Sequence, residues 1–156
     1  MKALEINGHN GERYIVNCHS RPGSFEKYAN LIRVEGNSLC YTGPSFGLTF
    51  VINGIPHIVK VENSYKWDGA SIPKRFQWLI GKPTDKEFRF ASMLHDDGYE
   101  ERSNRAINDV IFLYVLLEMG VPSWKADLMY KAVRAGGHAY YASDTSRFWR
   151  FVRKLL

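Results

Sequence analysis

Residues 84–119 read TDKEFRFASMLHDDGYEERSNRAINDVIFLYVLLEM, and their apolar residues recur at helical spacing. Thr84 and Glu87 stand three positions apart just before an apolar run, the spacing of a capping box, and predict a helix that ends near position 101. A second helix is predicted over 104–119, with Gly120 as its stop. Because the connection is short, we expect the two helices to pack side by side in antiparallel directions.

The chain before this helical pair has the pattern of short strands separated by turns. Its β-branched and aromatic runs lie at 13–18, 31–34, 38–41, 48–52 and 57–61. The Gly and Asn residues near these runs are typical of turns, as at Asn10-Gly11. We therefore predict a small antiparallel sheet within a strand-rich half, residues 1–65.

The chain after this half is predicted to be helical, over residues 66–156. A third helix is expected to begin at Pro122-Ser123 and to end at Gly136-Gly137, and a short final helix is expected over 145–155. Because the connections are too short for two independent domains, we expect residues 1–156 to form a single α+β domain. An N-terminal antiparallel β-sheet would pack on a three- to four-helix C-terminal core.

The composition limits the class of protein. Of the 156 residues, 45% are hydrophobic and 24% are charged, and the formal net charge is +5, all ordinary for a folded domain. No apolar run is long enough to cross a membrane, and the start of the chain lacks the apolar stretch of a signal peptide. We expect a cytoplasmic protein, or one that another assembly delivers.

The cysteine and histidine residues do not indicate a disulfide framework or a zinc site. Cys18 and Cys40 each lie in a strand-like run, where two buried thiols are the simpler interpretation and one disulfide is the alternative. The histidines outside the helical pair lack zinc-site spacing, and no Gly-rich phosphate loop is present. No specific nucleic-acid motif is found.

Asp109 is the residue that most needs an explanation, because it falls on the same helical stripe as Val110 and Leu113. An ionised carboxylate there is costly unless it is paired. The preceding helix places His95 on its apolar arc, with Tyr99 one turn on, so the antiparallel helices could bring His95 against Asp109. Such a carboxylate fixes the imidazole tautomer and makes the other nitrogen more basic, which is half of a triad with water as nucleophile.

The candidate catalytic residues are therefore His95, Asp109 and Tyr99. The structural alternative is that a buried His–Asp pair simply ties two helices together.

Two further carboxylates suggest a metal site beside this pair. Asp96 lies at the edge of the apolar arc, where it could hold a cation that favours oxygen ligands. Asp68 and Gly69 stand in an Asp-Gly-Ala-Ser turn at the junction of the two halves, and their oxygens could complete the site. The alternative is that Asp68 only forms the turn. Asp97 and Asp127 are expected to be solvated surface acids.

These motifs resemble an uncharacterised domain family common in bacteriophage and prophage genomes. The family signature is Trp-Asp-Gly-Ala-Ser-Ile-Pro, then His-Asp-x-x-Tyr, then an Asp early in the next helix. The chain has these features at 67–73, at 95–99 and at Asp109, and the resemblance extends over about residues 60–135. It implies a phage origin, and hence the host cytoplasm or the virion as location, but no activity.

The motifs are also similar to those of prokaryotic secreted phospholipases A2. Four segments carry this resemblance, at 68–71, 95–99, 109–112 and 130–134. It implies that His95 is the general base that activates a water and that Asp109 orients it. It also implies that Asp68, Asp96 and the Gly69 carbonyl bind Ca²⁺, which polarises an ester carbonyl.

Two functions stay open on this basis. One is a phage-encoded, calcium-assisted hydrolase of lipid esters. The other is a non-enzymatic phage protein that retains the helical scaffold, either a virion component or a binder of a host protein. Two departures from the phospholipases favour it: the chain has Ala70 where they have Cys, and residues 1–65 have no counterpart in them. The basic and aromatic segment 147–155 is expected to be a docked helix or a helix that binds a lipid or membrane surface.

Overall fold

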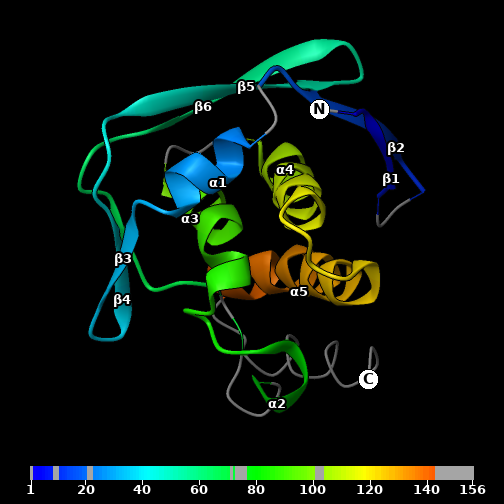
Figure 1. The fold of residues 1–156 in the computed structure, drawn as a ribbon. Helices are drawn as coiled ribbons and strands as arrows, with labels where there is room; N and C mark the ends of the chain where they lie inside the picture. Colours follow the sequence, from blue (N-terminus) through cyan, green and yellow to red (C-terminus); the bar gives the residue numbers. More distant parts are fainter. Residues whose placement is uncertain are drawn as a thin grey trace.

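The computed structural model of the chain describes residues 2–8, 11–20, 23–70, 72, 77–100 and 104–142, with the backbone alone at 99–100 and 135–142. Apart from one short helix among the strands, the strands precede the helices along the chain (Figure 1), which confirms the predicted α+β class. The strands are β1 Leu4–Asn7, β2 Arg13–Cys18, β3 Ile32–Glu35, β4 Ser38–Tyr41, β5 Phe46–Ile52, β6 Ile55–Val61 and β7 Lys66–Trp67. The helices are α1 Ser24–Ala29, α2 Gln77–Ile80, α3 Lys86–Glu100, α4 Arg105–Glu118 and α5 Ser123–Ala142.

The described strands form two antiparallel sheets, so the prediction of one small sheet was incomplete. The larger sheet has the order β1-β2-β5-β6, and the smaller has the order β3-β4-β7. Helix α1 stands between β2 and β3 and separates the β3-β4 hairpin from the larger sheet along the chain. Positive φ angles at Asn53 (51°) and Gly54 (79°) give β5 and β6 the two-residue turn that suits strand twist.

The larger sheet buries one face against the helices. In β2, Tyr14, Val16 and Cys18 alternate with more exposed residues, as expected for a half-buried strand. Phe50 of β5 meets Tyr114 of α4 edge to face, with ring centroids 6.0 Å apart. Cys18 and Cys40 are both buried free thiols, as the simpler interpretation predicted.

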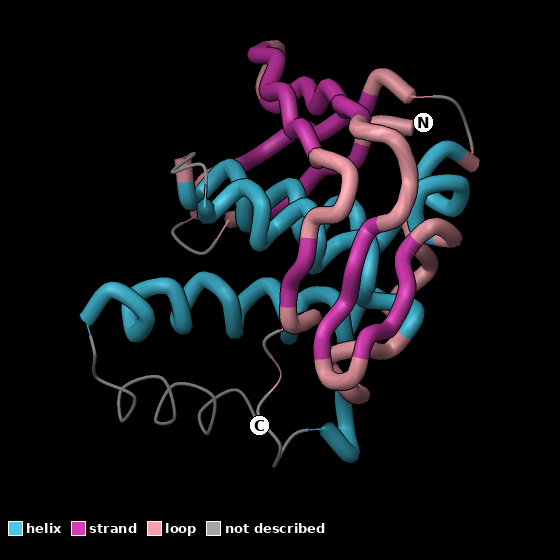
Figure 2. The backbone as a smooth tube through the Cα atoms, turned by 90° about the vertical axis from the view of Figure 1, so that its left-hand side faces the viewer, coloured by secondary structure: helices cyan, strands magenta, loops and turns pink. Residues whose placement is uncertain are grey.

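Helix α4 lies at the centre of the molecule. It runs beneath the larger sheet, beside α3, and α5 crosses below both (Figures 1 and 2). Every residue from 108 to 116 is buried, so α4 is enclosed on all sides rather than along one stripe. Any side chain in this interval, Asp109 included, therefore lies within the protein.

The bounds of α3 and α4 lie within two residues of the predicted ones, α5 runs past its predicted end, and the short helices α1 and α2 were not predicted. Helix α3 begins at Lys86, and α4 is capped by Asn104, whose side chain accepts a hydrogen bond from the Ile107 N–H at 3.3 Å. Helix α5 continues through Gly136-Gly137, where we predicted its end. Glycine lowers helix propensity by about 1 kcal/mol but permits helical angles, and no proline follows.

Two further expectations concern the C-terminus and membranes. The final helix predicted over 145–155 lies outside the described residues. Within the described ranges, none of the helices combines the length and the hydropathy that crossing a bilayer requires.

Candidate active site

The site is built where α3 and α4 cross closely. Gly98 of α3 faces the side chain of Asn108 of α4, and a Cβ at position 98 would collide with that amide. The Asn108 amide is buried and donates to the backbone carbonyl of His95 at 2.9 Å. A small residue on one helix and a fitted amide on the other thus hold the two backbones together, next to the predicted catalytic pair.

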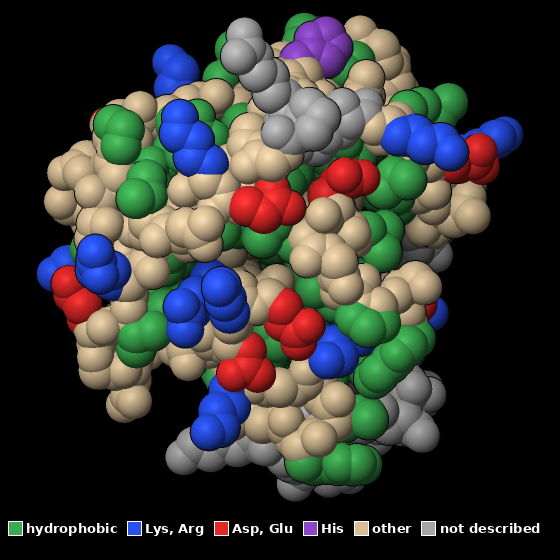
Figure 3. All heavy atoms as spheres, viewed as in Figure 1, with side chains coloured by type: hydrophobic (Ala, Val, Ile, Leu, Met, Phe, Trp, Pro, Cys, Tyr) green, Lys and Arg blue, Asp and Glu red, His purple; other side chains and the backbone are tan. Residues whose placement is uncertain are grey.

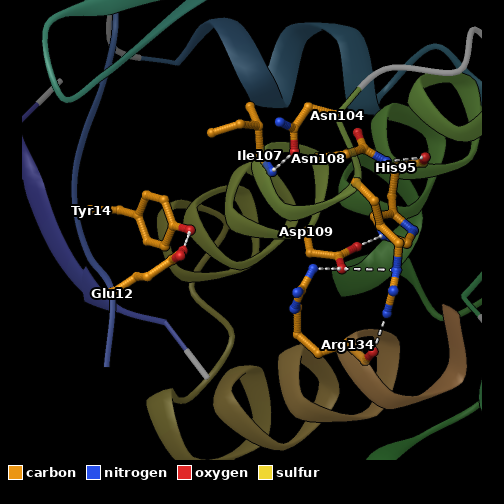
Figure 4. Close-up of polar contacts among 9 residues, drawn as sticks. Glu12, Tyr14, His95, Asn104, Ile107, Asn108, Asp109 and Arg134 are labelled. Carbon is orange, nitrogen blue, oxygen red and sulfur yellow. Dashed lines mark hydrogen bonds and ion pairs between the residues drawn. The ribbon is translucent and has the colours of Figure 1, made fainter. Parts of the chain in front are cut away.

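His95 and Asp109 contact each other, as predicted from the sequence. The distance from His95 Nε2 to Asp109 Oδ1 is 2.7 Å, and the dashed line in Figure 4 marks this contact. Asp109 is fully buried, whereas the His95 side chain keeps 10% exposure. An ionised carboxylate only accepts hydrogen bonds, so His95 Nε2 carries the hydrogen in a pair with ionised Asp109.

Two arginines surround the other oxygen of the same carboxylate. Arg134 of α5 donates from Nη1 to Asp109 Oδ2 at 2.9 Å, and Arg105 of α4 places Nε 3.9 Å from that oxygen. Arg105 also donates through Nη2 to the backbone carbonyl of Arg134. Asp109 therefore links α3, α4 and α5 (Figure 4), and its buried charge is compensated by a guanidinium.

Two tyrosines extend this polar region towards the sheet. Burial, followed by the hydrogen bond to Glu12, raises the pKa of Tyr14 to about 12, and the Tyr14 hydroxyl donates to the Glu12 carboxylate. Burial is also the main cause of the raised pKa of Tyr130, and the charge of Asp109 adds to it while that of Arg134 opposes it. Both hydroxyls are therefore neutral near pH 7. Figure 4 shows the Tyr14–Glu12 contact on the β2 side of α4, apart from the His95–Asp109 contact.

Asp68, the first of the predicted metal ligands, is exposed on the smaller sheet. Its carboxylate accepts a hydrogen bond from Ser38 Oγ at 3.3 Å. The turn is anchored to α3, because the Trp67 indole donates to Ser92 Oγ at 2.9 Å. Gly69 has φ of 88°, and a Cβ there would collide with the Pro83 carbonyl, so this position needs glycine.

The α3 carboxylates differ from the prediction in one respect. Asp96 is half-buried, as expected for the edge of the apolar arc. The backbone of Tyr99, the third candidate catalytic residue, lies in α3, and its side chain is outside the described residues. Asp97, predicted to be a surface acid, is buried at 7% exposure. The next residue, Gly98, packs against Asn108 of α4, so Asp97 stands where the two helices approach closely. Among the described side chains, no group of three or more His, Cys, Asp or Glu residues is arranged to hold a metal ion.

Sequence reasoning missed Arg105, Asn108 and Arg134. Arg105 carried a usable signal, since it stands four residues before Asp109 on one helix, the spacing of an ion pair. Arg134 carried none, because its contact depends on how α5 crosses the other two helices.

Two curated proteins of Sinorhizobium fredii resemble the chain. Uncharacterized protein y4jT is 40% identical over 85 residues, which are 48% of this chain and 25% of that protein. Uncharacterized protein y4iH is 31% identical over 115 residues, which are 63% of this chain and 47% of that protein. The chain thus spans about a quarter of the first relative and about half of the second. No solved structure matches it.

The family match covers more than half of the chain. Residues 49–133 match the family described as protein of unknown function DUF1353. This segment includes Asp68, His95 and Asp109, and it ends one residue before Arg134. The chain therefore belongs to the DUF1353 family of proteins of unknown function.

Proposed function

We propose that the chain is a phospholipase-A2-like hydrolase of lipid esters, in which His95 is the general base and Asp109 orients it. The observation that carries this proposal is the 2.7 Å contact between His95 Nε2 and the fully buried Asp109. A carboxylate that receives the Nε2 hydrogen leaves Nδ1 as the atom that takes a proton. The remaining exposure of the imidazole, 10%, gives water a route to the ring.

The proposed reaction uses water as the nucleophile. Nδ1 of His95 removes a proton from the water while the water oxygen bonds to the ester carbonyl carbon. When the tetrahedral intermediate collapses, the carbon–oxygen bond to the alcohol breaks, and the imidazolium returns the proton to the leaving alkoxide. The products are a carboxylic acid and an alcohol, and His95 and Asp109 regain their starting state.

Calcium is a separate part of the proposal. Asp68, Asp96 and the Gly69 carbonyl offer the oxygen donors that Ca²⁺ prefers. Because the described side chains do not converge as a group of three, backbone carbonyls and water would have to complete the ligand set. A bound cation would polarise the ester carbonyl and stabilise its oxyanion. Terbium luminescence measures this binding, and Asp68→Asn is expected to weaken it; equal binding by the variant would remove Asp68 from the site.

A second candidate is a binding protein without catalysis, a phage virion component or a partner of a host protein. It is favoured by the ion pair between Asp109 and Arg134, because a carboxylate that joins three helices has a sufficient structural role. Exposed tryptophans, Trp78 at 82% and Trp124 at 55%, offer contacts to a partner. Basic and acidic side chains are interspersed on the face in Figure 3, which favours a protein partner over nucleic acid there.

The test compares wild type with His95→Gln on phosphatidylglycerol vesicles, with millimolar calcium and with a chelator. The hydrolase is expected to release fatty acid with calcium, and the folded His95→Gln variant is expected to release none. His57→Gln on strand β6 is the matched control and should keep full activity. The binding protein predicts no release from wild type, with stability as the main property that His95→Gln changes.

A further inference from the structure

We infer that Arg134 is a positioning residue for the His95–Asp109 pair, so that the site needs α5 as well as α3 and α4. Arg134 holds the Asp109 carboxylate by Oδ2 and thereby keeps Oδ1 on His95 Nε2. The catalytic consequence of this inference rests on the proposed hydrolase. The effect of Arg134 on the hydrogen bond between His95 Nε2 and Asp109 Oδ1 does not depend on that function.

The two carboxylate oxygens have divided roles. Oδ1 lies 2.7 Å from His95 Nε2, and Oδ2 lies 2.9 Å from Arg134 Nη1. The two oxygens belong to one planar group, and rotation about the Cβ–Cγ bond turns both together, so a donor that holds Oδ2 also restrains Oδ1. Since Asp109 is fully buried, the direction of its carboxylate is set by protein donors rather than by bulk water.

Arg105 is the group that makes the orientation depend on Arg134. Its Nε is buried without a hydrogen-bond partner among the described residues, and it lies 3.9 Å from Oδ2. A buried guanidinium N–H without an acceptor is unfavourable, so Arg105 competes for the carboxylate. With Arg134 in place, Oδ2 is already occupied. Without Arg134, the carboxylate is expected to turn towards Arg105 Nε and away from His95.

The position of Arg134 is itself fixed by Arg105. Nη2 of Arg105 donates to the Arg134 backbone carbonyl, which ties this turn of α5 to the start of α4. Arg134 also follows directly after the segment that matches the family, residues 49–133. The matched segment therefore contains the pair but not the residue that holds it in place.

The test observes the His95 imidazole N–H by proton–nitrogen NMR on full-length protein labelled at histidine. The His95 signal is assigned by its absence in His95→Gln. Wild type is expected to show a downfield Nε2–H that exchanges slowly with water. In Arg134→Met this proton should exchange roughly tenfold faster or more, or its signal should disappear. Arg134→Lys keeps a cationic donor and should restore the signal.

The matched control is Lys131→Met on the same helix, which removes an exposed ion pair to Asp127. It should leave the His95 signal unchanged. If Arg134→Met does not fold, Arg134→Gln takes its place, because its uncharged side chain is polar but ends two bonds short of the position of Nη1. A wild-type Nε2–H that exchanges freely, or one unaffected by these substitutions, would overturn the inference.

Hydrolysis gives a second and separable readout. If wild type hydrolyses esters, Arg134→Met should lower kcat by about a hundredfold with KM unchanged, since binding of the ester does not need the pair to be aligned. If wild type hydrolyses nothing, the proposed function fails while the NMR result still decides the role of Arg134.

Discussion

Replacing Asp109 by alanine tests how much the three-helix contact stabilises the fold. The substitution removes the 2.7 Å contact to His95 and the 2.9 Å ion pair to Arg134, and it leaves two guanidinium groups without their carboxylate. Breaking a buried ion pair costs about 3–5 kcal/mol. Because the Arg105 and Arg134 side chains keep 22% and 19% exposure, water reaches them and the lower end, about 3 kcal/mol, applies.

Urea unfolding followed by tryptophan fluorescence measures this loss. With a slope of about 2 kcal/mol per molar urea, the midpoint should fall by about 1.5 M. Asp127→Ala is the matched control, since its exposed pair with Lys131 should contribute less than about 1 kcal/mol. A loss for Asp109→Ala no larger than for Asp127→Ala would refute the reasoning. It would mean that the buried carboxylate adds no net stability.

Three further perturbations test other parts of the structure. Burial raises the pKa of Tyr114 from its ordinary value of 10.0 to about 12, so the neutral side chain stabilises the fold fully below pH 10.0 and this stabilisation is lost as the pH rises towards 12. Between about pH 9 and pH 11, the free energy of unfolding in urea should therefore decline less for Tyr114→Phe than for wild type. Gly98→Ala forces a Cβ onto the Asn108 amide and should cost about 1–3 kcal/mol in the same assay, whereas no loss would mean that α3 and α4 can separate freely. Asn104→Ala removes the cap of α4 and should lower the thermal unfolding midpoint by the equivalent of about 1 kcal/mol; an unchanged midpoint would show that the 3.3 Å hydrogen bond is not formed in solution.

The helical pair could be predicted from sequence because its signals are local. The apolar spacing and the residues that bound it located α3 and α4 to within two residues, and the buried carboxylate pointed to His95. The reason given for Asp109 was too narrow, however. It is buried because α4 is enclosed all round, and a stripe of apolar residues does not reveal that.

The missed features depend on long-range packing. Arg134 reaches Asp109 only through the crossing of α5 over α3 and α4, and no spacing in the sequence reports that crossing. The strands β3 and β4 had local signals, but the pairing of β4 with β7 joins residues nearly thirty positions apart, so the sequence did not show that they form a second sheet. The Asp68 carboxylate could be placed in a turn, but not on the exposed side beside Ser38.

The proposed hydrolysis by the His95–Asp109 pair can be measured with one assay. Fatty acid release from phosphatidylglycerol vesicles is followed for wild type and for His95→Gln, after circular dichroism shows that both are folded. If His95 is the general base, wild type releases fatty acid in the presence of calcium and His95→Gln releases none. No release by wild type with calcium present, or equal release by both proteins, would contradict the proposal.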